Sequence, residues 1–303
     1  MPTFRSLFFA PANRPELVAK FPRFAADCYV IDLEDGTPPA DKAAARDGLK
    51  ALIDSVRGSC AGLPGALPGA LTVRVNEPGS DHYLDDLAAA WHCDIDGVVI
   101  PKLESVDQLF PALHWLRRLE RDAPRAEPRF ILGGLESIRG VANAAALCAA
   151  DPLLSAVYFG AEDLASELGA RRTKEATEVL YARSLVLLHA KAARIAAIDQ
   201  AVVEIRDDSH FEVDAIAGRN LGYDGKICLL PRQLAVAHRV FRPSDAEIEH
   251  ARRLIATYAA ATARGLGTID FEGQMIDGPL LKRAQRLVAL GEQLARGDSG
   301  AES

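Results

Sequence analysis

Two acidic residues follow two apolar segments in the middle of the chain, and together they have the chemistry of a cation site. Phe130–Glu136 ends in a glutamate and Val157–Asp163 ends in an aspartate, while the Ala-rich stretch Val141–Ala150 between them suits a covering helix. Because successive strands of a parallel sheet end at one edge, Glu136 and Asp163 are predicted to meet there. Carboxylate oxygens are the ligands that Mg²⁺ takes. The alternative is that each acid caps the helix after its strand.

Further charged residues accompany other predicted strands and are expected at the same edge. Glu34 and Asp35 follow the second apolar segment, and Lys102 ends the fourth. Arg74 lies inside the third, where an unpaired charge is costly, so two interpretations stay open. It forms a structural ion pair with Glu34 or Asp35, or it binds a substrate carboxylate with both arms of its guanidinium. Asp32, which alternates with Glu34, is a candidate for a buried structural acid.

The N-terminal segment carries an excess of positive charge, although the whole chain has a net charge of −7. Arg5, Arg14, Lys20 and Arg23 are opposed there by one acid, Glu16. A patch of this kind suits a phosphate-bearing ligand, because guanidinium and ammonium groups donate charge-assisted hydrogen bonds to phosphate. The alternative for each residue is a place on the solvated face of the first helix.

Eight short apolar segments alternate with helical segments along residues 1–242, and this order predicts a (β/α)8 barrel. Several of the segments are almost wholly apolar, as expected for parallel strands covered on both faces. The Gly-x-Gly-x-x-Gly signature of a dinucleotide-binding fold does not follow the first segment, which disfavours an open doubly wound sheet. The predicted strands are Ser6–Pro11, Cys28–Glu34, Leu71–Asn76, Asp96–Lys102, Phe130–Glu136, Val157–Asp163, Arg194–Asp199 and Gly225–Leu230.

The chain continues beyond the predicted barrel as a helical extension, residues 243–303. Ser244 and Glu247 form a capping-box pattern that predicts the start of a helix. Thr268–Ile276 is expected to form two short extended pieces, and Pro279–Ala295 a final amphipathic helix. Such an extension packs on its own barrel or reaches a neighbouring subunit.

Composition narrows the classes of function. The chain has 303 residues, of which 49% are hydrophobic, so it can bury a large core. Its acidic net charge and pI of about 5.6 argue against nucleic-acid and membrane-surface partners. We predict no membrane span and no secretory signal. The odd number of cysteines, without a Cys-x-x-Cys pair, indicates buried thiols in a reducing compartment, and we expect a cytoplasmic protein.

Taken together, the motifs resemble the citrate lyase β-subunit-like branch of the HpcH/HpaI aldolase/citrate lyase superfamily. They follow the family's order over nearly the whole chain. Two positions depart from the family pattern, because Leu230 replaces a frequent His and Gly36 replaces a commoner Ala. The matching stretches are Arg5–Phe9, Ile31–Asp35, Val73–Asn76, Pro101–Ser105, Gly160–Leu164, Gly222–Lys226 and Met275–Asp277.

The resemblance implies a metal-dependent enzyme with its active site at the C-terminal end of a (β/α)8 barrel. Glu136 and Asp163 would hold Mg²⁺. Arg74 would bind the carboxylate of a 2-oxo acid. Glu34 and Asp35 would shape the surroundings of the metal and take part in catalysis.

The resemblance also implies contacts made by residues outside that group. Gly160 would adjoin the substrate, and Arg5 and Arg14 would lie near the phosphates of coenzyme A. The acid matching Asp277 enters the active site of an adjacent subunit in acyl-CoA relatives, usually in a trimer. We therefore expect a homotrimer or higher homo-oligomer in which Asp277 transfers the proton. The alternative for Asp277 is an N-cap for the helix near Pro279.

The implied reaction is reversible cleavage of a 3-hydroxyacyl-CoA thioester, such as malyl-CoA or citramalyl-CoA, into acetyl-CoA and a 2-oxo acid. Four alternatives stay open. The protein acts on an acyl-carrier-protein thioester as a citrate lyase β subunit, it is a free-acid pyruvate aldolase, it also hydrolyses the thioester, or it is a non-catalytic binding barrel. The replacement of the family's His by Leu230 leaves the choice of substrate undetermined.

Overall fold

The computed structural model describes residues 4–60 and 67–301, and from residue 296 onward it describes the backbone only. The chain divides into two compact units, Met1–His238 and Arg239–Ser303. This division falls shortly before the boundary that we expected after residue 242. The first unit contains the parallel strands, and the second contains two long helices joined by a short hairpin.

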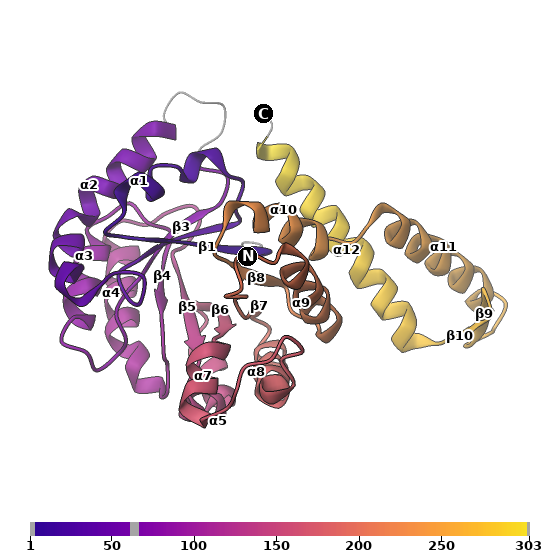
Figure 1. Ribbon diagram of the computed structural model, residues 1–303. Coiled ribbons are helices and arrows are strands. Elements are labelled where there is room, and N and C mark those ends of the chain that lie inside the picture. Colours follow the sequence, from indigo (N-terminus) through magenta and orange to yellow (C-terminus); the bar gives the residue numbers. More distant parts are fainter. Residues whose placement is uncertain (1–3, 61–66, 302–303) are drawn as a thin grey trace. The chain divides into compact units, whose positions relative to one another are not determined.

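Parallel strands of the first unit form a closed barrel, in which each strand pairs with the next and β8 returns to β1 (Figure 1). The closed barrel confirms the (β/α)8 fold predicted from the alternation of apolar and helical segments. The strands are β1 (Ser6–Pro11), β2 (Cys28–Asp32), β3 (Ala70–Arg74), β4 (Gly97–Ile100), β5 (Phe130–Leu135), β6 (Leu154–Phe159), β7 (Ala196–Asp199) and β8 (Gly225–Cys228).

Helices follow the strands and cover the outside of the barrel, as Figure 1 shows for α2, α3 and α4. The α-helices of this unit are α1 (Pro15–Val18), α2 (Lys42–Cys60), α3 (Tyr83–Trp91), α4 (Phe110–Asp122), α5 (Ile138–Ala142), α6 (Ala144–Cys148), α7 (Ala161–Leu168), α8 (Leu180–Ala193) and α9 (Asp208–Leu221). Helix α10 (Pro231–Val240) contains the division between the two units. Short 3₁₀ helices are η1 (Phe21–Arg23), η2 (Pro39–Asp41), η3 (Val106–Leu109) and η4 (Thr177–Val179).

The strand predicted to run to Asp163 is shorter than expected. β6 ends at Phe159, and Gly160 is the N-cap of α7. The Gly160 N–H still donates to the carbonyl of Leu135 on β5, at 3.2 Å, before the chain turns into the helix. Asp163 therefore lies in the first turn of α7 rather than at the end of a strand.

The barrel interior is apolar along most of its length and becomes charged at the C-terminal ends of the strands. Alternate residues of each strand point inward, and Val30 on β2 and Ala156 on β6 belong to the central cluster. The same alternation brings Asp32 inward after Val30 and Tyr158 inward after Ala156. The register between β2 and β3 then pairs Asp32 with Arg74. Strand periodicity thus places a polar layer on top of an apolar core.

A second charged group lies between the barrel wall and the helices outside it. Lys226 on β8 is fully buried, and its ammonium lies 2.5 Å from Asp214 on α9 and 3.3 Å from Asp199 on β7. Arg183 on α8 pairs with the same two aspartates. Because all four groups are buried, each charge depends on its partners for compensation. Lys226 closes one of the stretches on which the family resemblance rests, and its position indicates a structural role.

The second unit has its own small core. Helices α11 (Asp245–Thr262) and α12 (Gly278–Ala301) are joined through the antiparallel strands β9 (Ile269–Phe271) and β10 (Gln274–Ile276). The predicted capping box begins α11, because the Ser244 hydroxyl accepts from the Glu247 N–H at 3.2 Å. The residues that pack together, from both helices and both strands, include Ala251, Leu254, Phe271, Ile276 and Ala284.

Two further expectations concern the chain as a whole. Each of the five cysteines is a buried free thiol, as predicted. Among the helices that the structure describes, none combines the length and the apolar character of a bilayer-spanning segment.

Replacing Lys226 by methionine should destabilise the barrel strongly. Lys226→Met keeps the side-chain volume but leaves Asp199 and Asp214 with Arg183 as the remaining positive partner. Breaking a buried ion pair in this way costs about 3–5 kcal/mol, which urea denaturation should show as a lower free energy of unfolding. Lys191→Met is the matched control, because Lys191 pairs with Asp224 at the surface, where the loss should stay below about 1 kcal/mol. Equal losses would contradict the structural role of Lys226.

Candidate active site

Arg74 is held by two buried acids at the C-terminal end of the barrel. Its Nε and Nη2 donate to the two carboxylate oxygens of Asp32, both at 2.7 Å. Its Nη1 lies 2.9 Å from Glu34, and its guanidinium lies over the Phe9 ring, 5.0 Å from the centroid. Burial raises the pKa of Asp32, but the paired Arg74 outweighs that effect, and the pKa is lowered.

This arrangement decides part of the question left open by the sequence. Arg74 makes a structural ion pair, and its partners are Asp32 and Glu34 rather than Asp35. Gly36, which departs from the family pattern, lies close under Asp32: its N–H donates to Asp32 at 2.8 Å, and an added Cβ would overlap the same oxygen. Glycine at this position thus leaves room for the carboxylate that binds Arg74.

Lys102 extends the ion-pair chain across the barrel mouth. Its ammonium lies 2.7 Å from Glu34, and more distantly 3.6 Å from Asp35 and 3.8 Å from Glu77. Burial raises the pKa of Glu34, and the neighbouring Arg74 and Lys102 oppose but do not cancel this effect. Lys102 has a φ of 49°, in the left-handed region, which costs roughly 1–2 kcal/mol for a residue with a Cβ. Such strain is maintained where the surrounding contacts require it.

Glu136 is a deeply buried acid of the site, and it forms no ion pair with any basic residue in the described part of the chain. It is 3% exposed, and its Oε1 accepts hydrogen bonds from the Tyr158 hydroxyl at 2.7 Å and from the Lys102 N–H at 2.8 Å. Burial, and next the nearby charge of Glu34, raise the pKa of Glu136 to about 7. A carboxyl with this pKa is poorly compensated as an anion by the protein groups around it.

Two glycines make the space that Glu136 occupies. Gly134 precedes it on β5, and a Cβ there would lie 2.7 Å from Oε1 and overlap the Tyr158 hydroxyl. Gly160 faces the other oxygen, and a Cβ there would overlap Oε2 and the Glu136 Cβ. The carboxylate can lie between β5 and β6 because neither position carries a side chain.

A cavity of about 570 Å³ contains both acids that the sequence singled out. Glu136 and Asp163 line it, although Asp163 comes from α7 and not from a strand end. Burial raises the pKa of Asp163, opposed by the charge of Lys102. The complete lining is Glu77, Pro78, Gly79, Ser80, Lys102, Glu104, Gln108, Glu136, Ser137, Asp163, Ser166 and Glu167.

These donors are consistent with Mg²⁺. Both are carboxylates, neither sulfur nor imidazole accompanies them, and Glu136 Oε2 is not used by the two hydrogen bonds described above. Mg²⁺ commonly takes one or two carboxylates and completes its octahedron with water and substrate oxygens. In the described part of the chain, no group of three or more His, Cys, Asp or Glu side chains forms a metal cage. The residues therefore fit a cation shared with water and substrate.

The other predicted residues lie in different places. Asp35 is on the same edge but largely exposed. Arg14 is also exposed, and it pairs with Glu16 at 2.5 Å. Arg5 immediately precedes β1, so it lies at the opposite, N-terminal end of the barrel. It binds Asp27 there through two nitrogens, at 2.8 and 2.9 Å. Arg5 therefore lies away from the mouth, and its expected position near the phosphates of coenzyme A stays a prediction.

Asp277 belongs to the second unit, where it is half-buried. It lies between β10 and α12, and its carbonyl accepts from the Leu281 N–H at 3.0 Å, in the first turn of the helix. The structure shows this local setting, which matches an N-terminal helix position. The catalytic role of Asp277 stays a prediction.

Sequence reasoning missed Tyr158. Its side chain is 1% exposed within an apolar segment, where a tyrosine resembles any other core aromatic. The signal that could have identified it is the alternation along β6, because Tyr158 points inward two residues before Gly160. In the register between β5 and β6, Tyr158 pairs with Gly134 on β5.

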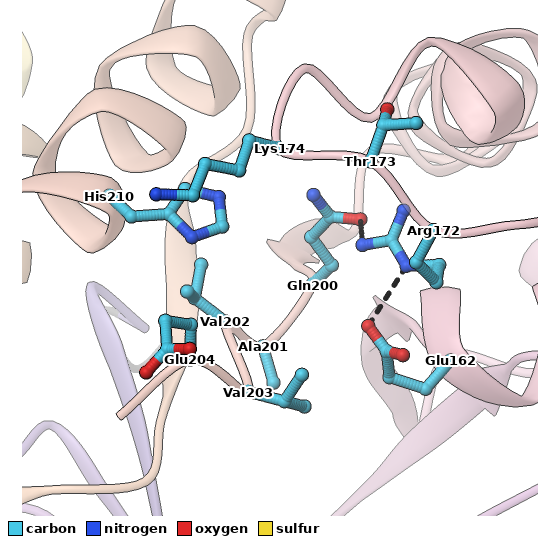
Figure 2. Close-up of a pocket in the computed structure, with 10 residues that line it drawn as sticks. All are labelled: Glu162, Arg172, Thr173, Lys174, Gln200, Ala201, Val202, Val203, Glu204 and His210. Atoms are coloured by element: carbon cyan, nitrogen blue, oxygen red, sulfur yellow. Dashed lines mark hydrogen bonds and ion pairs between the residues drawn. The ribbon is translucent and has the colours of Figure 1, made fainter. Parts of the chain in front are cut away.

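A second cavity, of about 230 Å³, has Glu162 of α7, Arg172 and Gln200 among its lining residues. Figure 2 shows Arg172 joined to Glu162 and to Gln200, at 2.9 and 3.3 Å. Gln200 in turn donates to Asp214 of the buried network, at 3.0 Å. The cavity therefore borders a continuous chain of contacts from that network to Glu162, which immediately precedes Asp163.

Comparison with known proteins agrees with this geometry. The HpcH/HpaI aldolase/citrate lyase family matches residues 5–231. A citrate lyase subunit beta-like protein of Deinococcus radiodurans is 42% identical over 287 residues, covering 94% of this chain and 96% of the relative. The human mitochondrial citramalyl-CoA lyase is 31% identical over 307 residues, covering 94% of this chain and 85% of its own.

A solved structure with the same fold is CitE of Mycobacterium tuberculosis, in complex with magnesium, acetoacetate and coenzyme A. It is 30% identical and superposes with a TM-score of 0.77, covering 96% of this chain and 98% of that protein. The similarity therefore includes both units of the chain.

Adding a methyl group at residue 160 should disturb the site. In Gly160→Ala the new Cβ meets the Glu136 carboxylate, so we expect a loss of about 1–3 kcal/mol in the free energy of unfolding, measured by urea denaturation. The control is Gly48→Ala, on the exposed side of α2, where nothing lies within 4 Å of an added Cβ. That change should stabilise the protein by about 0.5–1 kcal/mol. A stabilised Gly160→Ala protein would show that the carboxylate is not confined there.

Proposed function

Because the chain belongs to the HpcH/HpaI aldolase/citrate lyase family, we propose that it is a Mg²⁺-dependent lyase acting on a 3-hydroxyacyl-CoA thioester. The family makes it a carbon–carbon lyase that releases an oxo acid. The proposed products are acetyl-CoA and a 2-oxo acid, as from malyl-CoA or citramalyl-CoA. The observation that carries the proposal is that Glu136 and Asp163, distant in sequence, line one cavity.

The charge of the mouth supports a divalent cation. Asp32 and Glu34 are paired with Arg74 and Lys102, whereas the ion pairs of the described residues give the proposed ligands Glu136 and Asp163 no basic partner. When bound, Mg²⁺ supplies Lewis-acid stabilisation to the substrate oxygen that gains carbonyl character.

Arg74 retains donors for the carboxylate of the oxo acid. A guanidinium has five N–H groups, and the hydrogen bonds to Asp32 use one on Nε and one on Nη2, while Nη1 lies 2.9 Å from Glu34 in an ion pair. The second N–H of Nη2 is not used by Asp32, and we propose that it binds the substrate carboxylate together with an N–H of Nη1. We infer that Asp32 orients Arg74, so that the structural and binding interpretations of Arg74 both hold.

The reaction needs two proton transfers. As the carbon–carbon bond breaks, its electron pair passes to the thioester fragment, giving an enolate, and the hydroxyl loses its proton to become the carbonyl of the oxo acid. The enolate carbon then takes a proton to give acetyl-CoA. We propose Asp277 of a neighbouring subunit as the group that exchanges this proton, in a homotrimer or higher oligomer. Glu34 and Asp35 stay candidates for the hydroxyl proton.

The lining of the cavity favours an oxo acid with a single carboxylate. Five acids and one lysine line it, and Lys102 is already bound to Glu34. A second carboxylate, as in oxaloacetate, would enter a region of like charge without a free positive partner, which is unfavourable. Glyoxylate and pyruvate carry no such group, so malyl-CoA and citramalyl-CoA are preferred over citryl thioesters.

A panel of thioesters tests this function. With Mg²⁺, we expect kcat/KM for malyl-CoA or citramalyl-CoA to exceed that for citryl-CoA by at least about tenfold, which corresponds to about 1.4 kcal/mol. Removing the metal with EDTA, or changing Asp163 to Asn, should abolish turnover while the circular dichroism spectrum is kept. Glu104→Gln removes one of the acids that line the cavity. It should therefore reduce the ratio of kcat/KM for malyl-CoA or citramalyl-CoA to kcat/KM for citryl-CoA.

Three results would contradict the proposal. Full activity in metal-free buffer would exclude the metal role. A preference for citryl-CoA would contradict the inference that the acidic lining disfavours a second substrate carboxylate. Turnover of free hydroxy acids without a thioester would favour the aldolase alternative. Activity restricted to acyl-carrier-protein thioesters would favour a citrate lyase β subunit.

Asp277 can be tested by isotope exchange. Asp277→Asn should slow the wash-in of deuterium from solvent into the methyl group of acetyl-CoA by about 10²–10⁴-fold, because the proton has lost its carrier. Asp270→Asn is the control, since Asp270 accepts the Gly273 N–H in the same hairpin and asparagine preserves that bond. Unchanged exchange in the Asp277 variant would remove it from the mechanism.

Mixed oligomers test whether Asp277 serves a neighbour. Asp277→Asn and Asp163→Asn proteins should each be inactive alone. After joint refolding, some sites would combine an intact metal site from one subunit with an intact Asp277 from another, and activity should return. No recovery would place Asp277 in the site of its own subunit.

A further inference from the structure

We propose that Tyr158 and the backbone N–H of Lys102 position Glu136 for the metal, by holding Oε1 so that Oε2 is presented to the cation. Tyr158 is then a positioning residue. This inference rests on the proposed function, because it concerns the same metal. It adds a role for two groups, a hydroxyl inside the barrel and a strained backbone, that the proposed chemistry does not itself require.

Both hydrogen bonds end on one oxygen. Oε1 accepts from the Tyr158 hydroxyl at 2.7 Å and from the Lys102 N–H at 2.8 Å. The donors come from different parts of the barrel, since Tyr158 is on β6 and Lys102 lies in the loop after β4. A carboxylate held from two sides through a single oxygen cannot rotate freely about its terminal bond. Its second oxygen then keeps one orientation, beside Gly160.

The surroundings of Tyr158 fix the ring. It belongs to the apolar cluster of the barrel interior and is 1% exposed. Gly134 leaves room for the hydroxyl, because a Cβ there would overlap it. A buried phenol usually finds a hydrogen-bond partner, and the partner here is Glu136. Because the ring is held in the packed core, its hydroxyl holds the Glu136 carboxylate in one position.

The backbone of Lys102 acts from the opposite side. Lys102 has a φ of 49°, which directs its N–H to Glu136 while its ammonium binds Glu34. A relaxed conformation would be cheaper for a residue with a Cβ. The strained conformation thus coincides with the hydrogen bond to the proposed metal ligand.

A neutral donor has an advantage at this position. Lysine or arginine in place of Tyr158 would compensate the charge of Glu136 and compete with the cation. A phenol donates one hydrogen bond and leaves the negative charge in place. The carboxylate is therefore oriented without losing its attraction for Mg²⁺.

The test uses Tyr158→Phe, which removes one hydroxyl and keeps the ring, in the full-length protein. Isothermal titration with MgCl₂ should give a Kd about 10–100-fold higher than that of the original protein, as for other groups that orient metal ligands. With saturating Mg²⁺, kcat should recover to within a few-fold. A merely structural hydroxyl would lower the unfolding midpoint without changing the Mg²⁺ Kd.

Tyr223→Phe is the matched control. Tyr223 is also buried, and its hydroxyl donates to the Arg183 carbonyl, at 2.7 Å, near the outer charge network. It should lower the unfolding midpoint as Tyr158→Phe does, but leave the Mg²⁺ Kd unchanged. Equal Kd values for the two variants would overturn the positioning role.

A second comparison tests the backbone of Lys102. Lys102→Gly and Lys102→Ala both lose the ammonium, but glycine adopts the left-handed conformation without strain. Lys102→Gly should therefore bind Mg²⁺ several-fold more tightly than Lys102→Ala. Equal affinities would remove the Lys102 backbone from the proposal. If the original protein binds no Mg²⁺, the proposed function fails, whereas binding that Tyr158→Phe leaves intact overturns the positioning role alone.

Discussion

The pairing of Arg74 with Asp32 and Glu34 is the interaction on which the barrel mouth depends. Inward-pointing charges at this depth are costly unless they compensate one another. Arg74 and Lys102 compensate two acids, which leaves Glu136 without a basic ion-pair partner among the residues that the structure describes. The pKa of Glu136, raised to about 7 by burial and by Glu34, is the consequence. A divalent cation between Glu136 and Asp163 would complete the balance.

The barrel contains a second charged group whose composition is different. Arg183 and Lys226 face Asp199 and Asp214, so this group is balanced within itself. It has no need of a further ion, and it lies between the barrel wall and the helices outside it. Gln200 connects it to Arg172, and Arg172 to Glu162 beside Asp163 (Figure 2). The charge-balanced network thus contacts, through Arg172 and Glu162, the first turn of α7, which carries the proposed metal ligand Asp163.

Much of this was predictable because it follows from periodicity. Alternating apolar and helical segments predicted the eight-stranded barrel, and the motifs predicted the family. Glu136 and Asp163 were expected to meet because strands of a barrel end at one edge, and they line one cavity even though β6 ends before Asp163. The position of Arg5 could also have been predicted, since a residue before β1 lies at the other end.

The remaining features depend on information that the local sequence does not contain. The partner of Arg74 is set by the register between β2 and β3, which selects Asp32 instead of Asp35. Tyr158 is one aromatic residue in an apolar segment, and its role depends on the position of Glu136, which follows the neighbouring strand β5. The same limit applies to Asp277, because its proposed place is in a different subunit. An acid fixed in the mouth would compete with the substrate for the cation and for Arg74. Proton transfer by an acid from a neighbouring subunit, as proposed, would separate proton transfer from metal and carboxylate binding.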